Sequence, residues 1–167
     1  VALVMNDYLH LEQSDRKTRW NMKSEICIIS CGAKKIWNTN PDAPKTRAKD
    51  AYIGPLFKKC KEYADTLYPE SWYILSDKYG LIHPDTLISD YNTPPSAIDG
   101  NRDFIMFVSA QVSKLKLNPA IIVTTTGQIH QSIIKAVFTK SKIINPLSGL
   151  GQGKRMQKIN QILGEKK

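Results

Sequence analysis

Short apolar runs that alternate with amphipathic helical stretches are the feature that most constrains how this chain can fold. Each run is four or five residues long and rich in β-branched or aromatic side chains, which is typical of buried strands. Between the runs, apolar residues recur with the period of a helix. The alternation predicts an α/β fold, a three-layer sandwich with a mainly parallel central sheet. The expected strands lie at residues 26–30, 72–75, 120–123 and 141–145, and the expected helices at residues 55–67, 98–115, 128–138 and 154–163.

Polar clusters follow three of the expected strands, at the point where each strand ends. They are Ser30–Lys35, Ser76–Tyr79 and Thr124–Gly127. Open α/β sheets bind ligands outside the carboxyl ends of their parallel strands, so we expect the three clusters to converge on one site. A single cluster of this kind is equally typical of an ordinary polar loop. His130 lies one helical turn further on, where a structural hydrogen bond or a site role fits it. No histidine is near Cys31 in the sequence, so we interpret Cys31 as a small packing residue rather than a nucleophile.

The charge distribution indicates a polyanionic partner. The net charge is +9, and no aspartate or glutamate occurs between Phe104 and Gly164. Such a span should form a positive face of the kind that binds nucleic acid, although surface lysines also serve solubility alone. The glycine-rich stretch Gly149–Gly153 leads into Lys154 and Arg155, a combination suited to phosphate groups. It does not match the dinucleotide-binding glycine pattern, and the loop Cys31–Lys35 does not match the Walker pattern.

Length and composition indicate one domain and argue against a membrane protein and a disulfide-rich protein. The 167 residues fit one catalytic domain, which we place at residues 23–167, with residues 1–22 as an N-terminal extension. No apolar run approaches the roughly 20 residues of a membrane span and no secretory signal is apparent, so we expect a cytoplasmic protein without membrane contact. The three cysteines form no Cys-x-x-Cys pair. Neither a disulfide framework nor a metal site is therefore indicated, and no cofactor is expected.

Four segments resemble the bacterial and phage DUF6884 family, namely Ser30–Lys35, Ala48–Phe57, Trp72–Leu81 and Pro84–Asp85. The likeness extends over residues 23–163. The family is related to the YaaA-type peroxide-stress proteins and, more distantly, is similar to the uracil-DNA-glycosylase superfamily. The resemblance implies a uracil-DNA-glycosylase-like fold. By analogy with one member of this type, it also implies an anti-phage DNA glycosylase that removes glucosylated hydroxymethylcytosine from phage DNA and leaves abasic sites. Asp77 replaces the small residue expected between Ser76 and Lys78, which leaves its role open.

The residue types present suit the hydrolysis of a base from DNA without a metal ion. A glycosylase flips the target nucleotide into a pocket and uses a carboxylate or a positioned water at an oxocarbenium-like transition state. We expect Asp85 or Asp90 to supply the carboxylate, with Asn38 as the alternative group that positions water. The substrate-binding candidates are Ser30, Cys31, Gly32, Trp37, Tyr52, Ser76, Lys78, Tyr79, Tyr91, Asn92, Thr126, Gly127 and His130. The candidates for contacts with DNA phosphates are Lys34, Lys35, Arg47, Lys154 and Arg155.

Two other functions fit the same residues. A non-enzymatic protein that binds or protects DNA would show salt-sensitive binding without abasic products. An N-glycosidase or base transferase that acts on free nucleosides would turn over small molecules and would not depend on the basic face. The sequence leaves the excised base, the strandedness of the DNA and the oligomeric state open.

Overall fold

The computed structural model describes residues 24–166, so the expected extension at residues 1–22 lies outside the described residues. The described chain alternates strands with helices, as the apolar pattern predicts. The elements are β1 (Glu25–Ser30), η1 (Ile36–Asn38), β2 (Thr46–Arg47), α2 (Ala48–Ala51), α3 (Pro55–Leu67), β3 (Trp72–Ser76), β4 (Gly80–Ile82), β5 (Leu87–Ile88), η2 (Pro95–Ala97), α4 (Arg102–Lys114), β6 (Ile121–Thr124), α5 (Gln128–Val137), β7 (Lys142–Ile144) and α6 (Gln152–Lys166).

The central sheet has the order β4-β3-β1-β6-β7. Its four strands β3, β1, β6 and β7 run parallel, and β4 pairs antiparallel with β3. The prediction of a mainly parallel sheet is therefore confirmed. The short strand β4, and the separate two-stranded sheet of β2 and β5, were not predicted from the sequence. They are two or three residues long, which is too short to leave a periodic signal.

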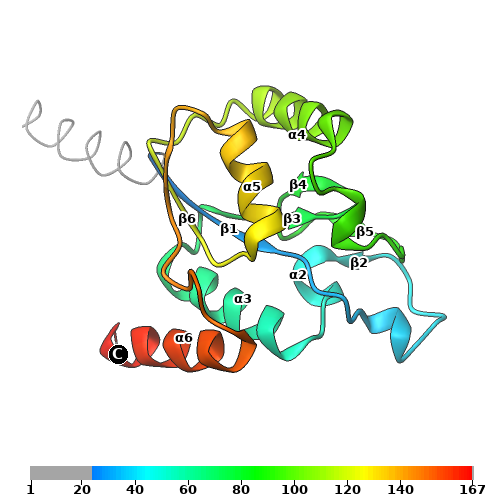
Figure 1. Cartoon of the computed structure of the whole chain (residues 1–167). Helices are drawn as coiled ribbons and strands as arrows, with labels where there is room; N and C mark the ends of the chain where they lie inside the picture. The colour runs from blue at the N-terminus through cyan, green and yellow to red at the C-terminus, as the bar shows by residue number, and fades with distance from the viewer. Residues whose placement is uncertain (1–23, 167) are drawn as a thin grey trace, which may run out of the picture.

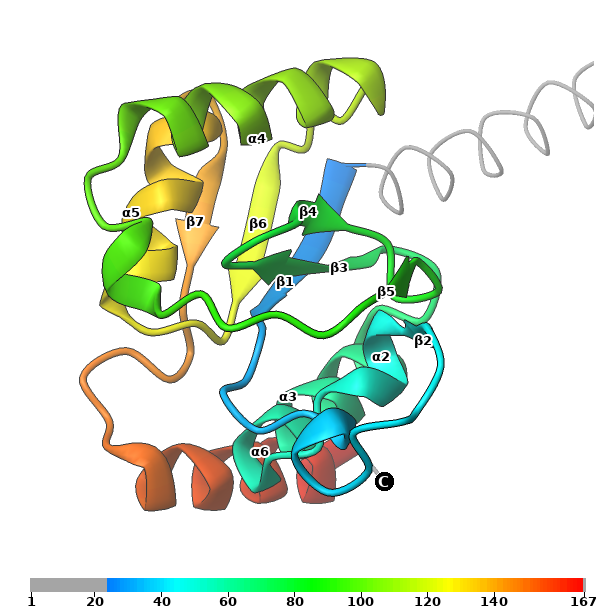
Figure 2. The ribbon, with the colours of Figure 1, turned by 90° about the vertical axis from the view of Figure 1, so that its right-hand side faces the viewer.

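Helices cover both faces of this sheet (Figures 1 and 2). Helices α3 and α6 lie on one face, and helices α4 and α5 lie on the other. Successive side chains of β1 point to opposite faces, as the pleat of a strand requires. Ile29 is fully buried in one core with Phe57 of α3, whereas Ile28 is fully buried in the other with Ile133 of α5. A strand buried on both sides explains the continuous apolar run at its position in the sequence.

Two helices begin at residues other than those expected. Helix α4 begins at Arg102 rather than at residue 98, because the side chain of Asn101 caps it by accepting a hydrogen bond from the backbone N–H of Phe104 at 3.1 Å. The apolar spacing of this helix predicts that Phe107 faces the sheet, but its side chain is 45% exposed. Helix α6 begins at Gln152, two residues before the expected start. Within residues 24–166, the helices are all too short or too polar to cross a bilayer.

The tight turn between β3 and β4 yields a test of the fold. Gly80 has φ +71°, and a Cβ added there would clash with Gln111 Oε1 and lie 2.8 Å from Cε1 of Phe107. Gln111 holds the turn, because its Oε1 accepts the N–H of Leu81 at 2.8 Å and its Nε2 donates to the carbonyl of Tyr79 at 2.9 Å. We expect Gly80→Ala to lower the free energy of unfolding by about 2–4 kcal/mol, from left-handed backbone strain plus overpacking.

Gly100 provides the matched control for this substitution. Its φ is also positive, at +63°, but a Cβ there would meet no atom within 4 Å. Gly100→Ala should therefore lose only about 1–2 kcal/mol, the strain contribution alone. Urea unfolding of both variants measures the difference, and equal losses would contradict the packing of α4 against the turn.

Candidate functional site at the carboxyl ends of the parallel strands

The chain reverses its winding direction between β1 and β6, which lie side by side in the sheet. The helix that follows β1 is α3, on one face, and the helix that follows β6 is α5, on the other (Figure 1). The loops beyond these two strands therefore diverge and leave a space between them. In open α/β sheets, such a switch point is where ligands bind. Two of the three polar clusters predicted from the sequence lie at this point, and the third follows the adjacent strand β3.

Three side chains meet at the switch point, one from each of the three strand ends. Nε2 of His130 lies 2.7 Å from Oδ1 of Asp77 and 4.0 Å from Sγ of Cys31. Asp77 and His130 are 6% and 7% exposed, and Cys31 is half-buried. We call these residues the strand-end cluster. The fold brings His130 to Cys31 across 99 positions of sequence, so a histidine is near this thiol in space although none is near it in the sequence. Cys31 also packs against the hydrophobic core, as expected of a packing residue.

The strand-end cluster offers one sulfur, one nitrogen and one oxygen donor, all within 4.8 Å of one another. Donors of these types bind zinc and related metals. Two ligands of one tetrahedral zinc ion, each about 2.1 Å from the metal, would lie about 3.4 Å apart. Asp77 and His130 are closer than that, at a distance typical of a direct hydrogen bond. The cluster is therefore arranged as a hydrogen-bonded acid–imidazole pair beside a thiol.

A chain of buried hydroxyl groups lies next to the cluster. Oγ of Ser76 donates to the phenol oxygen of Tyr91 at 3.1 Å, and that oxygen lies 2.6 Å from the phenol oxygen of Tyr52. Oγ of Ser76 also accepts the backbone N–H groups of Lys78 and Tyr79, which turns the chain sharply after β3. Burial raises the pKa of both Tyr52 and Tyr91, so both phenols are neutral hydroxyl groups at neutral pH.

Lys35 brings a buried positive charge to this region. The side chain is 7% exposed, and its Nζ lies 4.4 Å from the centroid of the Tyr91 ring. Nζ also donates to the carbonyl of Ala33 at 3.4 Å. The backbone of Lys35 is fixed twice, by a bridge to Tyr52 and by donation to Oδ1 of Asn38 at 2.7 Å. Asn38, expected to position water, is exposed and uses its carbonyl oxygen to shape this loop.

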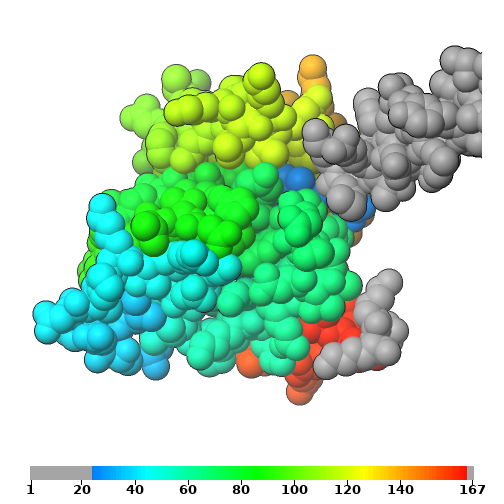
Figure 3. All heavy atoms as spheres, turned by 180° about the vertical axis from the view of Figure 1, so that it is seen from behind, coloured from blue at the N-terminus to red at the C-terminus, as the bar shows by residue number. Residues whose placement is uncertain are grey.

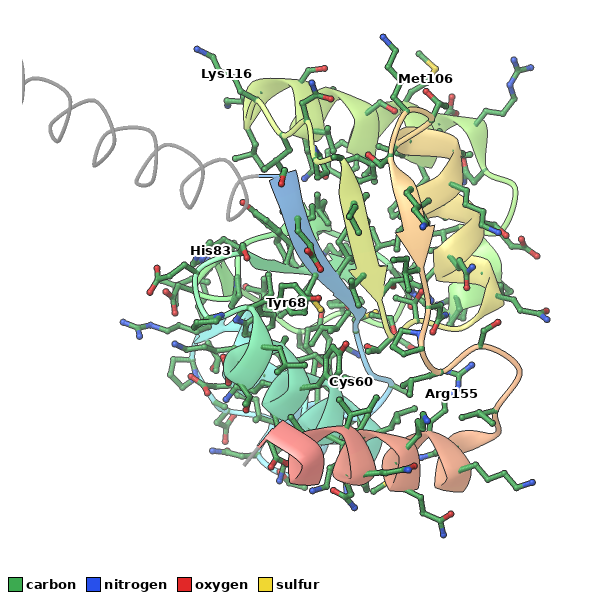
Figure 4. All side chains as sticks on the ribbon, turned by 90° about the vertical axis from the view of Figure 1, so that its left-hand side faces the viewer. Cys60, Tyr68, His83, Met106, Lys116 and Arg155 are labelled. Carbon is green, nitrogen blue, oxygen red and sulfur yellow. The ribbon has the colours of Figure 1, made fainter. Side chains whose placement is uncertain are left out.

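The carboxylate of Asp85 does not join the cluster. Because β4 runs antiparallel to β3, it carries the chain back to the amino end of β3 before Asp85 is reached. Oδ1 of Asp85 lies 2.7 Å from Nζ of Lys49 and 3.8 Å from Nη1 of Arg47, and its side chain is half exposed. These contacts lower the pKa of Asp85. Figure 4 shows His83, its neighbour in the sequence, well apart from Arg155 at the carboxyl ends of the strands.

The other predicted residues divide in the same way. Thr126, half-buried Gly127 and half-buried Ser30 lie at the strand ends, whereas Trp37 is buried and donates from Nε1 to the carbonyl of Ala43 at 2.8 Å. Trp37 is thus part of the packing of the segment 38–50, which protrudes from one edge in the view from behind (Figure 3). The other candidates Lys78, Asp90 and Asn92 are exposed to solvent.

A pocket of about 350 Å³ opens outside the carboxyl end of β1, and Cys31 and Gly32 line it. We call it the β1 pocket. Of the residues predicted to contact phosphates, Lys34 lines this pocket, and Arg155 lies at the start of the neighbouring helix α6. Lys154 is exposed beside Arg155. Arg47 lies instead with Asp85, away from the strand ends.

Three residues of this region were not assigned a role from the sequence. Asp77 was noted only as a departure from the expected pattern. Thr125 is 2% exposed and lines the β1 pocket. Asn145 donates from Nδ2 to the carbonyl of Thr126 at 2.9 Å and to Oε1 of Gln131 at 2.8 Å, so it fixes the loop after β6. Their common signal was available, since each lies just past the end of an apolar run.

Comparisons with known proteins identify the family. Residues 26–161 match the profile described as "Family of unknown function (DUF6884)". The chain belongs to the DUF6884 family. It is also similar to the "Uncharacterized protein YfjM" of Bacillus subtilis (strain 168), with 35% identity over 149 residues that cover 84% of this chain and 96% of the relative. No solved structure matches the chain. The segments that suggested DUF6884 in the sequence include Cys31 and Asp77 of the strand-end cluster, whereas His130 lies outside them.

The thiol of Cys31 provides a chemical probe of the cluster. Burial and the neighbouring charge of Asp77 raise its pKa to about 12, so it is a protonated thiol at neutral pH. We expect iodoacetamide to alkylate Cys31 at pH 8 at least about 100-fold more slowly than a free thiol, because the thiolate is the nucleophile. The rate should rise as the pH approaches 12.

Two variants control this measurement. Asp77→Asn removes the adjacent negative charge and should speed the alkylation of Cys31, whereas Asp85→Asn should leave it unchanged. Peptide mass spectrometry separates Cys31 from the buried Cys27 and Cys60. An equal rate in all three proteins would show that Asp77 does not act on the thiol.

Proposed function

We propose that the protein is a DNA glycosylase that hydrolyses the N-glycosidic bond of a modified base, with Asp77 as the catalytic carboxylate. The observation that carries the proposal is the buried pair of Asp77 and His130 at the switch point of the sheet. Bases that must be cut from DNA are first flipped out of the stack into a pocket. The β1 pocket lies beside this pair, since Cys31 lines the pocket and its Sγ lies 4.0 Å from Nε2 of His130.

The chemistry proposed for Asp77 follows from its surroundings. As the C1′–N bond breaks, the deoxyribose acquires oxocarbenium character, and a fixed carboxylate stabilises that positive charge in a water-poor site. A water molecule then forms the C1′–O bond, and its proton goes to the carboxylate or to the departing base. With Asp77 ionised, Nε2 of His130 carries the proton of their hydrogen bond, so His130 is a positioning residue that fixes the carboxylate. Cys31 is a thiol at neutral pH and is not the nucleophile in this proposal.

The proposal replaces the two carboxylates first expected to act. Asp85 is half exposed and paired with Lys49 at the other end of β3. Asp90 is exposed, and its Oδ1 accepts the N–H of the next residue, Tyr91, at 2.9 Å. A carboxylate in either setting is screened by solvent and stabilises a developing cation weakly. Asp77 is the buried acidic residue of the described chain that has the required position.

A polymeric substrate is favoured by the distribution of charge. The acid-free span from Phe104 to Gly164 includes residues 152–164 of α6, whose first turn carries Lys154 and Arg155 beside the β1 pocket. Within the proposal, the substrate is phage DNA that contains glucosylated hydroxymethylcytosine. The fold is then a variant of the uracil-DNA-glycosylase type, distantly related to the YaaA-type proteins. The abasic sites left in phage DNA would then protect the bacterial host against the phage.

The test is base release from phage DNA that carries glucosylated hydroxymethylcytosine, with unmodified DNA of the same sequence as control. Alkaline cleavage of the strands measures abasic sites, and we expect them in the modified DNA alone. Salt-sensitive binding without abasic sites would instead indicate a DNA-binding protein without this activity. Turnover of free nucleosides with intact DNA would indicate a nucleoside N-glycosidase. Either outcome would refute the proposal.

A further inference from the structure

The β1 pocket has features that the proposed reaction does not use. Its volume is about 350 Å³, and it lies between the loop after β1, the start of α3 and the start of α6. Residues on these segments that matter below are Lys34, Gly54, Phe57, Thr125 and Gln152. None of the residues that line the pocket is acidic, and neither Asp77 nor His130 is among them. Figure 4 shows Cys60 on α3 and Arg155 on α6, the two helices that flank the pocket.

Two helices direct their N-termini at this pocket. Helix α3 has 13 residues and begins at Pro55, with Gly54 before it and no side-chain cap. The backbone N–H groups of Leu56 and Phe57 therefore have no carbonyl partner inside the helix. Helix α6 has 15 residues, and neither helix has an acidic residue in its first turn. Free N–H groups and the helix dipole make such ends suitable for anions.

A buried hydroxyl group independently indicates a missing ligand. Thr125 is 2% exposed and lines the pocket, and its Oγ1 has no hydrogen-bond partner among residues 24–166. The thiol of Cys60 lies beside it, close enough for the Thr125 hydroxyl to lower the thiol's pKa, but a thiol is a weak hydrogen-bond partner. Nearly all buried hydroxyl groups in proteins are hydrogen-bonded, so an unpartnered one at a pocket wall requires an explanation. A ligand oxygen in the pocket would supply the partner.

Positive side chains complete the arrangement. Lys34 lines the pocket and is exposed, so its ammonium group can turn inward. Arg155 donates from Nε to the carbonyl of Leu150 at 2.8 Å, which fixes its guanidinium at the start of α6. The same guanidinium lies against Gly127, where an added Cβ would be 3.8 Å from Nη1.

We propose that the β1 pocket is a phosphate-binding subsite, formed by the N-termini of α3 and α6, the hydroxyl of Thr125 and the ammonium group of Lys34. The inference rests on the proposed function for its biological substrate, because in DNA the bound group would be the phosphodiester next to the flipped nucleotide. The chemistry recognised, a tetrahedral phosphate oxyanion, is the same in a free phosphate ester. The subsite would place the adjacent nucleotide beside Cys31 and the carboxylate of Asp77.

The test measures binding without any reaction. Inorganic phosphate, a DNA trinucleotide and the same trinucleotide with uncharged methylphosphonate linkages are titrated into the ¹⁵N-labelled full chain. We expect the first two ligands to shift the amide signals of Leu56, Phe57 and residues 152–154, and the uncharged analogue to leave them in place. Shifts with phosphate but not with the trinucleotide would assign the pocket to a free phosphate ester. Unmoved signals with both anions, or equal shifts with the uncharged analogue, would overturn the proposal.

Substitutions of threonine identify the role of the buried hydroxyl. Thr125→Val removes the hydroxyl at constant shape and should weaken phosphate binding about fivefold or more. Thr125→Ser retains it and should bind like the wild type, and Thr66→Val, on the exposed side of α3, is the matched control. Unchanged affinity in a folded Thr125→Val protein would overturn the proposal. Base release is measured separately, so phosphate binding without base release would refute the glycosylase proposal and leave this one standing.

Discussion

The variant Asp77→Asn is expected to release base from DNA at least about 100-fold more slowly than the wild type. Asparagine has the shape of aspartate and can still accept a hydrogen bond from His130, which lies 2.7 Å from Oδ1 in the wild type. It lacks the negative charge that the proposed mechanism requires as the sugar becomes cationic. Single-turnover rates with saturating enzyme measure this loss without a contribution from product release.

Asp85→Asn is the matched control for that experiment. Asp85 follows β4, and its carboxylate is half exposed and paired with Lys49. Exposed ion pairs of this kind contribute little to stability, so the variant should fold normally. We expect its rate of base release to remain within about twofold of the wild type, because its charge is remote from the strand ends. Full activity of Asp77→Asn, or an equal loss in both variants, would refute the assignment of Asp77.

Ile28→Ala is expected to lower the free energy of unfolding by about 2–5 kcal/mol. Ile28 is fully buried in the central strand β1, in the core that also contains Ile122 of β6 and Ile133 of α5. Truncation removes its apolar contacts and leaves a cavity between strands and helices that cannot all move inward. Urea unfolding followed by circular dichroism measures the change in midpoint at constant slope.

Ile144→Ala on the edge strand β7 is the control for Ile28→Ala. The residue type and the type of element are the same, but Ile144 is 40% exposed. Its truncation should cost less than about 1 kcal/mol, because much of its surface is already in water. Similar losses at the two positions would contradict the placement of β1 at the centre of the sheet.

The architecture was predictable because it depends on local patterns. The run Ile26–Ile29 is apolar throughout, since β1 is buried on both faces, and the helix after Gly54 shows its buried side at regular spacing. Parallel strands end at one edge, so convergence of the three polar clusters followed from the fold class. Membership of the DUF6884 family was likewise evident from the segments that flank these strand ends.

The carboxylate that we propose as catalytic, Asp77, was not predictable from the same patterns. Asp85 and Asp90 were the expected candidates because both follow the end of a predicted strand, but the short strand β4 returns the chain to the opposite end of the sheet before Asp85. Three residues of antiparallel pairing leave no periodic signal, and they decide where Asp85 lies. The contact of Cys31 with His130 depends on β1 and β6 being neighbours in the sheet. The sequence alone does not predict this order of the strands. Phe107 was expected to face the sheet because it lies at the border of the apolar side of α4, where the helical spacing does not separate buried from exposed positions.

The crystal structure of the Asp77→Asn variant bound to a duplex with one glucosylated hydroxymethylcytosine is the most direct test of the account. The slowed variant should retain the intact nucleotide long enough to be seen. We predict that this nucleotide is flipped out of the helix, with its C1′ facing residue 77 and its base near Cys31, at the carboxyl ends of β1, β3 and β6. A duplex with the base still stacked, or a nucleotide placed beside Asp85 at the other end of β3, would contradict it.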